Sequence, residues 1–361
     1  MFSAAAGDRH RARALAALMV GVGLLAGCAD SMWRSSAHGA TRPVASAGAP
    51  PEVPPQFTRF AVPTRSATPD ALAAGPGGTA WFAETAADKI GRLDPDGSIR
   101  EFPVPTAAAG PEGISSGADG NMWFTENEAD KIGRITPAGV VREFAVPTGE
   151  AGPEGIASGP DGNMWFTENE ADKIGRITPA GVVREFAVPT GEAGPEGIAS
   201  GPDGNMWFTE NEANKIGRIT PGGGVREFPV PSKASGPDGI TAGPDHSVWF
   251  AEDDGVRIGR VSALGVVREF AIPTPGDSPS ELTTGPDGTL WFTENDGYIG
   301  HLGPDGSAHM FPLPDPDSSP GGIAAGPDGH LWVTAKDTNA IYRVAIVRSR
   351  TPGPTPTAAR P

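Results

Sequence analysis

Short runs of apolar residues alternate with polar turns along most of the chain. Residues 152–193 show the pattern most clearly, with turns at Pro160-Asp161-Gly162 and Pro179-Ala180-Gly181. Proline and glycine at these places favour tight turns between antiparallel strands. Prolines at such short intervals exclude long helices. The unit therefore predicts four short strands, at Gly155–Ser158, Asn163–Glu168, Lys173–Thr178 and Val182–Val188.

The same unit recurs around seven tryptophans. Their spacing is 42 residues, with a last interval of 41, and they stand at Trp81, Trp123, Trp165, Trp207, Trp249, Trp291 and Trp332. A repeat of this length with four strands per unit is typical of a β-propeller, in which each unit forms one blade. We therefore predict an all-β chain that forms a seven-bladed propeller of four-stranded antiparallel blades.

The two ends of the repeat region predict how the ring closes. The last repeat has three strands and ends near Ile346, whereas residues 57–63 match the fourth strand of the other repeats. A closed ring leaves no open sheet edge. We therefore expect the N-terminal strand to complete the last blade, and we assign the propeller to residues 56–347.

The segments outside the propeller predict a lipoprotein. A basic start and an apolar run end in Leu25-Ala26-Gly27-Cys28, which resembles a bacterial lipobox and contains the only cysteine. We assign residues 1–27 to a signal peptide, 28–55 to the acylated Cys28 and a flexible Ala/Ser/Pro tether, and 348–361 to a disordered Pro-rich tail. The expected location is the cell envelope, outside the cytoplasm, with the lipid anchor as the only attachment to a bacterial membrane.

The excess of acidic over basic side chains limits the classes of molecule that the protein can bind. After removal of residues 1–27, 25 basic and 43 acidic side chains remain, a net charge of −18. Nucleic acid is excluded as a partner, because binding to phosphates needs a basic surface. Electrostatic steering would favour a small-molecule or cationic ligand, and we expect the protein to be a monomer.

A carboxylate recurs where the first strand of a blade begins. The motif there is Pro-x-Gly-Ile or a variant, and in a propeller this position faces the central funnel. The x residues are Asp70, Glu112, Glu154, Glu196, Asp238, Ser280 and Gly321. The first six are the candidate ligand- or metal-binding residues, and a divalent cation, calcium or magnesium, is the candidate cofactor. A solvated acidic rim with no ligand is the alternative.

Pairs of residues across the central hairpin of each blade are interpreted as structural. If residues 127–130 form the loop, Trp123 faces Arg134 and Phe124 covers Gly133. Glu126 then faces Lys131, and we expect these two to form an exposed ion pair.

The repeat Gly-Pro-Asp-Gly-Asn-Met-Trp-Phe-Thr-Glu-Asn, followed by Lys-Ile-Gly-Arg-Ile-Thr, resembles the virginiamycin B lyase (streptogramin lyase) family over residues 56–347. The resemblance implies a seven-bladed propeller. It also implies elimination at the ester of a cyclic type B streptogramin, with a magnesium ion and a histidine base, and hence antibiotic resistance. The family's histidines occupy the positions of Ser280 and Gly321, and Lys336 stands near the place of a family glutamate.

These departures leave the function open at the level of sequence, because serine and glycine cannot replace two imidazoles. One interpretation is a ligand- or cation-binding module displayed from a membrane. The alternative is a lyase that acts on a cyclic ester or depsipeptide with a divalent metal, a metal-dependent carbon–oxygen lyase. No catalytic residue is assigned.

Overall fold

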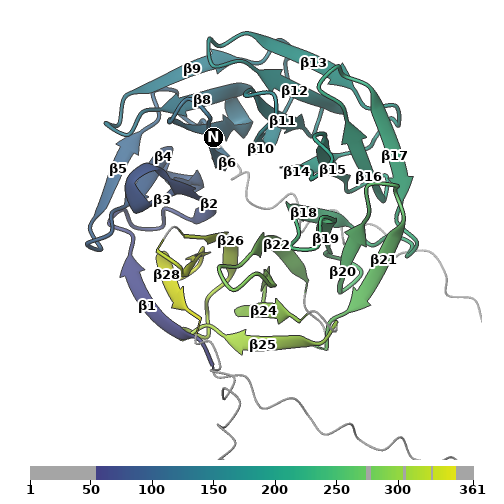
Figure 1. The fold of residues 1–361 in the computed structure, drawn as a ribbon. Helices are drawn as coiled ribbons and strands as arrows, with labels where there is room; N and C mark the ends of the chain where they lie inside the picture. The colour runs from purple at the N-terminus through teal and green to yellow at the C-terminus, as the bar shows by residue number, and fades with distance from the viewer. Residues whose placement is uncertain (1–53, 274–277, 304–305, 327, 347–361) are drawn as a thin grey trace, which may run out of the picture. The chain divides into compact units, whose positions relative to one another are not determined.

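Each repeat folds into one antiparallel sheet, because its apolar runs are too short for anything but strands and its Pro/Gly turns bring consecutive strands together. The computed structural model describes residues 54–273, 278–303, 306–326 and 328–346. Within them, 28 strands form seven four-stranded sheets arranged as blades around a common axis (Figure 1). This confirms the predicted seven-bladed propeller.

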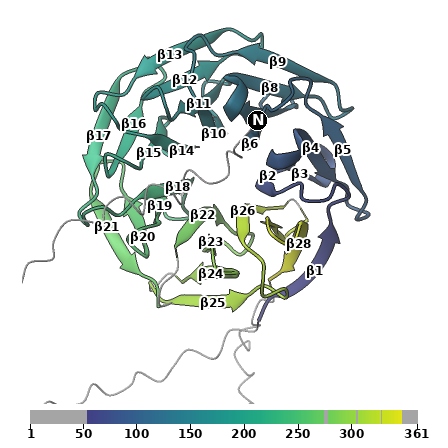
Figure 2. The same ribbon diagram turned by 180° about the vertical axis from the view of Figure 1, so that it is seen from behind.

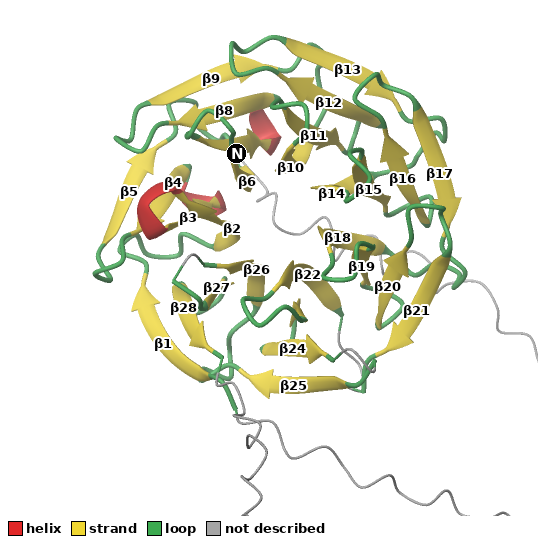
Figure 3. Cartoon of the chain, in the orientation of Figure 1, coloured by secondary structure: helices red, strands yellow, loops and turns green. Residues whose placement is uncertain are grey.

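Blades are numbered 1 to 7 along the chain, and each is given from its innermost to its outermost strand. Blades 1 to 3 are β2 (Pro69–Gly75), β3 (Thr79–Glu84), β4 (Lys89–Leu93) and β5 (Ile99–Pro103); β6 (Pro111–Ser116), β7 (Met122–Glu126), β8 (Lys131–Ile135) and β9 (Val141–Ala145); β10 (Pro153–Ser158), β11 (Met164–Glu168), β12 (Lys173–Ile177) and β13 (Val183–Ala187). Blades 4 and 5 are β14 (Pro195–Ser200), β15 (Met206–Glu210), β16 (Lys215–Ile219) and β17 (Val225–Pro229); β18 (Pro237–Ala242), β19 (Val248–Glu252), β20 (Arg257–Val261) and β21 (Val267–Ala271). Blades 6 and 7 are β22 (Pro279–Thr284), β23 (Leu290–Glu294), β24 (Tyr298–Leu302) and β25 (Ala308–Pro312); β26 (Pro320–Ala325), β27 (Leu331–Ala335), β28 (Ala340–Ala345) and β1 (Gln56–Ala61). The helical segments among the described residues are three short 3-10 turns, η2 (Pro76–Gly78), η3 (Thr85–Ala87) and η4 (Asn127–Ala129) (Figure 3).

The predicted registers of the central hairpin are confirmed. Trp123 pairs with Arg134 and Phe124 with Gly133, and the Arg134 guanidinium lies 5.5 Å from the Trp123 ring centroid. A Cβ at Gly133 would lie 2.1 Å from Phe124 Cζ, so only glycine leaves room for the ring. The innermost strand of blade 3 begins at Pro153, two residues earlier than expected.

The hydrophobic core lies between neighbouring blades. Trp123 and Ile132 of blade 2, for example, pack against Ile156, Met164 and Phe166 of blade 3, and all five are buried. Polar contacts reinforce the same interface, where Arg134 Nη1 donates to the carbonyl oxygen of Pro179 at 2.9 Å. The same contacts recur around the ring, so each blade is stabilised by both of its neighbours.

The N-terminal strand closes the ring. β1 pairs with β28 in antiparallel register, from Gln56 opposite Ala345 to Ala61 opposite Ala340. It lies on the outside of blade 7 in both views (Figures 1 and 2). Blade 7 is therefore built from both ends of the propeller, as predicted.

The expected exposed pair of Glu126 with Lys131 is wrong. The two residues are opposite in register, but Glu126 is fully buried and its carboxyl oxygens accept no hydrogen bond from Lys131. The Lys131 ammonium instead lies 3.0 Å from Glu143 Oε2 on the next strand. Burial, together with the charge of Glu143, raises the pKa of Glu126 to about 8, although the charge of Lys131 lowers it.

Several predictions concern residues outside the described ranges. The signal peptide 1–27, Cys28, most of the tether and the tail 348–361 lie there. In the described part of the chain, no helix has the length and apolar character needed to cross a membrane.

Candidate functional site

The innermost strand of every blade lies at the centre of the ring (Figure 1), and the residues that begin these strands form the candidate site. Hydroxyl groups hold the backbone there. Thr125 Oγ1 accepts from the Gly113 amide at 2.8 Å and donates to the Glu154 carbonyl oxygen of the next blade at 2.7 Å. Thr167 makes the same bridge from Gly155 to Glu196. Neighbouring inner strands are therefore fixed to one another by their side-chain and backbone hydrogen bonds.

Glycine follows the carboxylate in most blades because the next blade lies against it. A Cβ added at Gly113, Gly155, Gly197 or Gly239 would lie 2.3 to 2.6 Å from the carbonyl oxygen of the x residue in the following blade. This close approach brings the x residues together around one axis. Six of the x residues are partly buried, namely Asp70, Glu112, Glu154, Glu196, Asp238 and Ser280. We call these six residues, together with Glu281, the carboxylate ring.

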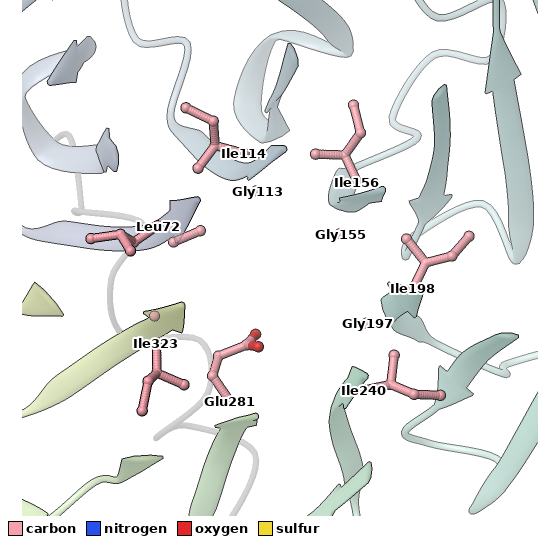
Figure 4. Close-up of a pocket in the computed structure, with 12 residues that line it drawn as sticks. Leu72, Gly113, Ile114, Gly155, Ile156, Gly197, Ile198, Ile240, Glu281 and Ile323 are labelled. Atoms are coloured by element: carbon pink, nitrogen blue, oxygen red, sulfur yellow. The ribbon is translucent and has the colours of Figure 1, made fainter. Parts of the chain in front are cut away.

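A central cavity of about 120 Å³ adjoins this ring (Figure 4). Its wall is mainly glycine backbone and the apolar side chains that follow, at Leu72, Ile114, Ile156, Ile198, Ile240 and Ile323. Glu281 is the charged residue in the lining, and its carboxylate points into the open space. The cavity thus combines an apolar collar with one inward carboxyl group.

Glu281 was missed at the level of sequence. It stands where Gly113, Gly155 and Gly197 stand in other blades, one place after the x residue of the motif. The signal was present, because Pro279-Ser280-Glu281-Leu282 is the copy of the motif with a charge in place of glycine or alanine. In the following blade, Gly321 and Gly322 are the second and third residues of the inner strand.

One ammonium group lies within the ring. Lys336, which directly follows β27, places its Nζ 2.8 Å from Asp70 Oδ1. A Cβ at Gly321 would lie 2.6 Å from Lys336 Cε and 2.7 Å from Asp70 Oδ1. The absence of a side chain at position 321 therefore makes space for the ion pair between blades 7 and 1.

Two further carboxylates have neutral partners. Ser280 Oγ donates to Asp238 Oδ2 at 2.9 Å, across the boundary between blades 5 and 6. Asn211 Nδ2 donates to Glu196 Oε2 at 2.9 Å within blade 4. These contacts orient the carboxylates without neutralising them, so the ring keeps most of its acidic character.

Burial and mutual repulsion raise the pKa values of the ring. Burial, followed by the charge of Glu196, raises the pKa of Glu154 well above its ordinary value. The pKa of Glu196 is raised by burial and by the charge of Asp238, although the bond from Asn211 lowers it. Burial and the charge of nearby Asp70 raise the pKa of Glu112 to about 8. Glu112 therefore holds a proton near neutral pH and would release it to a bound cation, and the pKa shifts of Glu154 and Glu196 have the same direction.

The carboxyl group in the cavity behaves in the same way. Burial and the charges of Asp238 and Asp70 raise the pKa of Glu281 to about 8, against the opposing effect of Lys336. Burial and the charge of Asp253 raise the pKa of Asp238 to about 7, and the Ser280 bond lowers it. For Lys336, burial lowers the pKa, but the surrounding carboxylates outweigh burial and the pKa is raised. Lys336 is therefore a permanent cation of the ring.

The sequence matches the virginiamycin B lyase family over residues 20–235 and 188–359. This chain belongs to the virginiamycin B lyase family. It is similar to a streptogramin B lyase structure, with 35% identity and a TM-score of 0.78 over 81% of this chain and 98% of that one. It is also similar to virginiamycin B lyase from Staphylococcus aureus, with 37% identity and a TM-score of 0.79 over 81% of this chain and 100% of that one.

A further structure of the Staphylococcus aureus virginiamycin B lyase is a catalytically inactive histidine-to-alanine variant with quinupristin. This variant is 37% identical to the present chain, with a TM-score of 0.78, and the alignment covers 81% of the present chain and 100% of the variant. The comparison with curated protein sequences returns no match.

The residues of this virginiamycin B lyase family member do not fit the magnesium ion that the resemblance implies. Ser280 and Gly321 stand at the two histidine positions, and the Lys336 ammonium lies where a family glutamate is expected. Within the described ranges, no three His, Cys, Asp or Glu side chains converge closely enough to hold a metal ion. His246 and His330 stand in turns at the far end of the inner strands, and His301 and His309 lie in β24 and β25. No step is therefore assigned to a metal.

Proposed function

We propose that the carboxylate ring and its cavity bind an organic cation with an apolar body and one or more ammonium or guanidinium groups. The observation that carries the proposal is the surplus of acid at one axis. Six carboxyl groups, at Asp70, Glu112, Glu154, Glu196, Asp238 and Glu281, lie near one ammonium group, Lys336, and the last of the six lines the cavity. Opposite charge placed in a partly buried site relieves their repulsion.

The wall of the cavity supports the same class of ligand. Leucine and isoleucine side chains lie beside the carboxyl groups, so an alkyl or aromatic body would be buried while its cationic ends reach the ring. Small-molecule sites commonly combine an apolar wall with a few polar groups in this way. Calcium, which takes several oxygen ligands in flexible geometry, is the inorganic alternative.

Calorimetric titration tests this function. The probes are an alkyl diamine, an alkyl guanidine, calcium chloride, magnesium chloride, and a neutral N-acetylated diamine as the uncharged comparison. We expect the organic cations to bind and the acetylated compound to fail. Replacing two ring residues, Glu154→Gln with Glu196→Gln, should weaken binding by about tenfold or more, because each charged hydrogen bond contributes about 1.5–3 kcal/mol.

The matched control removes two exposed glutamates from loops of the same blades, Glu150→Gln with Glu192→Gln. It changes the net charge equally and should leave the affinity within about twofold, since exposed charges interact weakly across water. An equal loss of affinity in the two double variants would show that the cation responds to the total negative charge and does not bind at the ring. If calcium chloride is the one probe that gives a heat of binding, the ligand of the ring is a metal ion and the proposed organic cation is wrong.

The raised pKa values predict how binding depends on pH. The ring holds protons that a cation must displace, so binding should release protons and strengthen from pH 6 to pH 8. Titrations in two buffers with different heats of ionisation measure the released protons directly. An affinity that does not change over this range would contradict binding at the ring.

A second function is a carbon–oxygen lyase acting on a cyclic depsipeptide ester, and Glu281 is the observation in its favour. Burial raises the pKa of Glu281 to about 8, so above that pH its carboxylate, which points into the cavity, can accept a proton from a substrate carbon. Elimination would then leave the proton on Glu281, form a carbon–carbon double bond, break the alkyl carbon–oxygen bond of the ester and release the carboxylate beside Lys336. With neither family histidine in place, we expect ring opening of a type B streptogramin to be absent or very slow.

Mass spectrometry of the streptogramin after incubation tests the lyase function. Turnover that is lost in Glu281→Gln and unaffected by a metal chelator would establish it. Intact antibiotic, together with binding of cations, would leave the binding module as the function.

A further inference from the structure

Exposed apolar side chains gather on the turns between the third and fourth strands of several blades. Val140, Val182 and Val266 occupy equivalent places in blades 2, 3 and 5, and Leu264 lies in the same turn as Val266. Their exposed fractions are 65, 59, 58 and 85%. They are the large apolar residues that stand out as exposed in the described part of the chain, and we call them the apolar row.

Basic side chains lie directly behind the apolar row. The outermost strand of each of blades 2 to 5 carries an exposed arginine at its second position, at Arg142, Arg184, Arg226 and Arg268. Residues two apart in an extended chain point to the same side, so each arginine stands on the side of the apolar position that precedes it. The guanidinium groups of Arg142 and Arg226 lie 4.9 and 5.0 Å from the rings of Phe144 and Phe228.

Both ends of the propeller lie on the face that carries the apolar row. In blade 2 the turn closes where the Thr136 amide donates to the Val140 carbonyl oxygen at 3.0 Å. The equivalent pair in blade 7 is Ala345 opposite Gln56. The residues that precede Gln56, with the predicted lipid anchor at Cys28, are therefore attached to the face that carries the apolar row.

We propose that this face rests on a lipid bilayer, with the apolar row in the interfacial region and the arginines against lipid phosphates. The proposal depends on acylation of Cys28, which would hold the face close to lipid. Apolar tips backed by basic residues suit a membrane interface. The tips are single side chains separated by polar turns, so they suit a fluid surface better than a shaped protein partner. The sequence predicts attachment by the anchor alone, and this face adds a second contact.

The placement fixes which way the binding site faces. The carboxylate ring stands at the start of the inner strands, where Pro111 pairs with Glu126. The apolar row stands at the opposite end of the blade, where Ile135 pairs with Met122 and Val141. A propeller that rests on its apolar row therefore turns the carboxylate ring away from the bilayer.

An environment-sensitive fluorophore tests the contact in the full, acylated protein. Because the acylated Cys28 is the only cysteine, a cysteine introduced by Val182→Cys or Glu192→Cys is labelled alone. Position 192 is exposed on the opposite end of the blade and serves as the control. On vesicles of phosphatidylcholine and phosphatidylglycerol, the label at 182 should shift to the blue and be quenched about threefold more strongly by spin-labelled lipid than the label at 192.

A second measurement removes the anchor. The full chain with Cys28→Ser should still sediment with these vesicles, weakly, and Gly224→Val, which fills the gap in the row at blade 4, should raise the bound fraction about two- to threefold. Replacing the four row residues by serine should abolish sedimentation. Equal labels at 182 and 192 would overturn the proposal. So would a dimer in solution that the serine replacements dissociate, because the row would then be an interface between two copies, and so would a protein that carries no acyl group.

Discussion

At the scale of single residues, the site depends on exchanges between large and small side chains. Glu281 occupies a place where five blades have glycine and one has alanine, and Gly321 has no side chain where five blades have a carboxylate. The empty place accepts Lys336, whose ammonium forms the ion pair with Asp70. These differences break the sevenfold repetition at blades 6 and 7, so a ligand that binds in one orientation around the ring must contact them.

Lys336→Met is the residue-scale prediction. It removes the partner of Asp70 and the cation that lowers the pKa values of Glu112 and Glu281. We expect a loss of about 1–3 kcal/mol of unfolding free energy at pH 8, because a partly buried charge is left unpaired. The affinity for an added organic cation should rise at the same time. Denaturant unfolding and calorimetry measure the two effects.

Lys233→Met is the matched control, because Lys233 is an exposed lysine in a loop. It should change neither quantity. A Lys336→Met protein as stable as the parent at pH 8, with unchanged affinity, would show that this ammonium has no role in the ring.

At the scale of the strand, β1 has a role that its position in the chain does not suggest. It is the outermost strand of blade 7, and its Phe60 lies beside Trp332 with ring centroids 5.9 Å apart. The Val62 amide donates to the Asn339 carbonyl oxygen at 3.0 Å and continues the contact beyond the strand. Closure of the ring therefore depends on contacts between residues nearly 300 positions apart, which form late and slowly in folding.

Deletion of residues 56–64 should leave blade 7 with three strands and an exposed edge. We expect the protein to lose cooperative thermal unfolding or to aggregate, because unpaired edges join to one another. Calorimetry and size-exclusion chromatography check this, and a truncation that removes only residues 29–55 is the control. An unchanged melting temperature in the longer deletion would contradict ring closure by β1.

At the scale of the whole molecule, buried acid dominates the response to pH. Each of blades 1 to 5 buries a glutamate at the end of its second strand, at Glu84, Glu126, Glu168, Glu210 and Glu252. Burial, with the charge of a neighbouring glutamate, raises their pKa values to about 8, or about 7 for Glu252. The carboxylate ring adds further groups of the same kind.

The sign of the pH effect follows from proton binding. Between about pH 4.5 and pH 8 the folded protein holds protons that the unfolded chain has released, so unfolding free energy falls as pH rises. Groups with lowered pKa values, such as Glu143 and Asp161, act in the opposite direction only in more acidic solution. We therefore expect a higher melting temperature at pH 5 than at pH 8, measured by calorimetry. Glu126→Gln with Glu168→Gln should flatten the difference, and a melting temperature that rises from pH 5 to pH 8 would contradict it.

The location of the molecule is also open to test. Cys28→Ser should move the protein from the membrane fraction to the soluble fraction of the cell, because the acyl chains supply most of the attachment. Fractionation followed by immunoblotting measures this. A variant that pellets with membranes as fully as the parent would contradict the lipid anchor.

The fold could be read from the sequence because period, strand number and the displaced strand at residues 57–63 all pointed to one ring. The inner strand of blade 3 was located to within two residues of its observed start at Pro153. Two details were not accessible. The opposite register of Glu126 and Lys131 was correct, but a lysine has four rotatable carbons and reaches Glu143 on the next strand instead. Glu281 was overlooked because the residue after the x position is glycine in five blades and alanine in another, so attention fell on the x residues alone.

Because Gln56 lies directly opposite Ala345, the first and last residues of the ring could be joined by a turn no longer than the one from Thr136 to Val140. The chain could then be opened at the corresponding turn of any other blade. Such a circular permutant would keep every blade-to-blade interface and move only the point of attachment. All of these attachment points lie on one face, so the tether could migrate around the circumference without turning the molecule over.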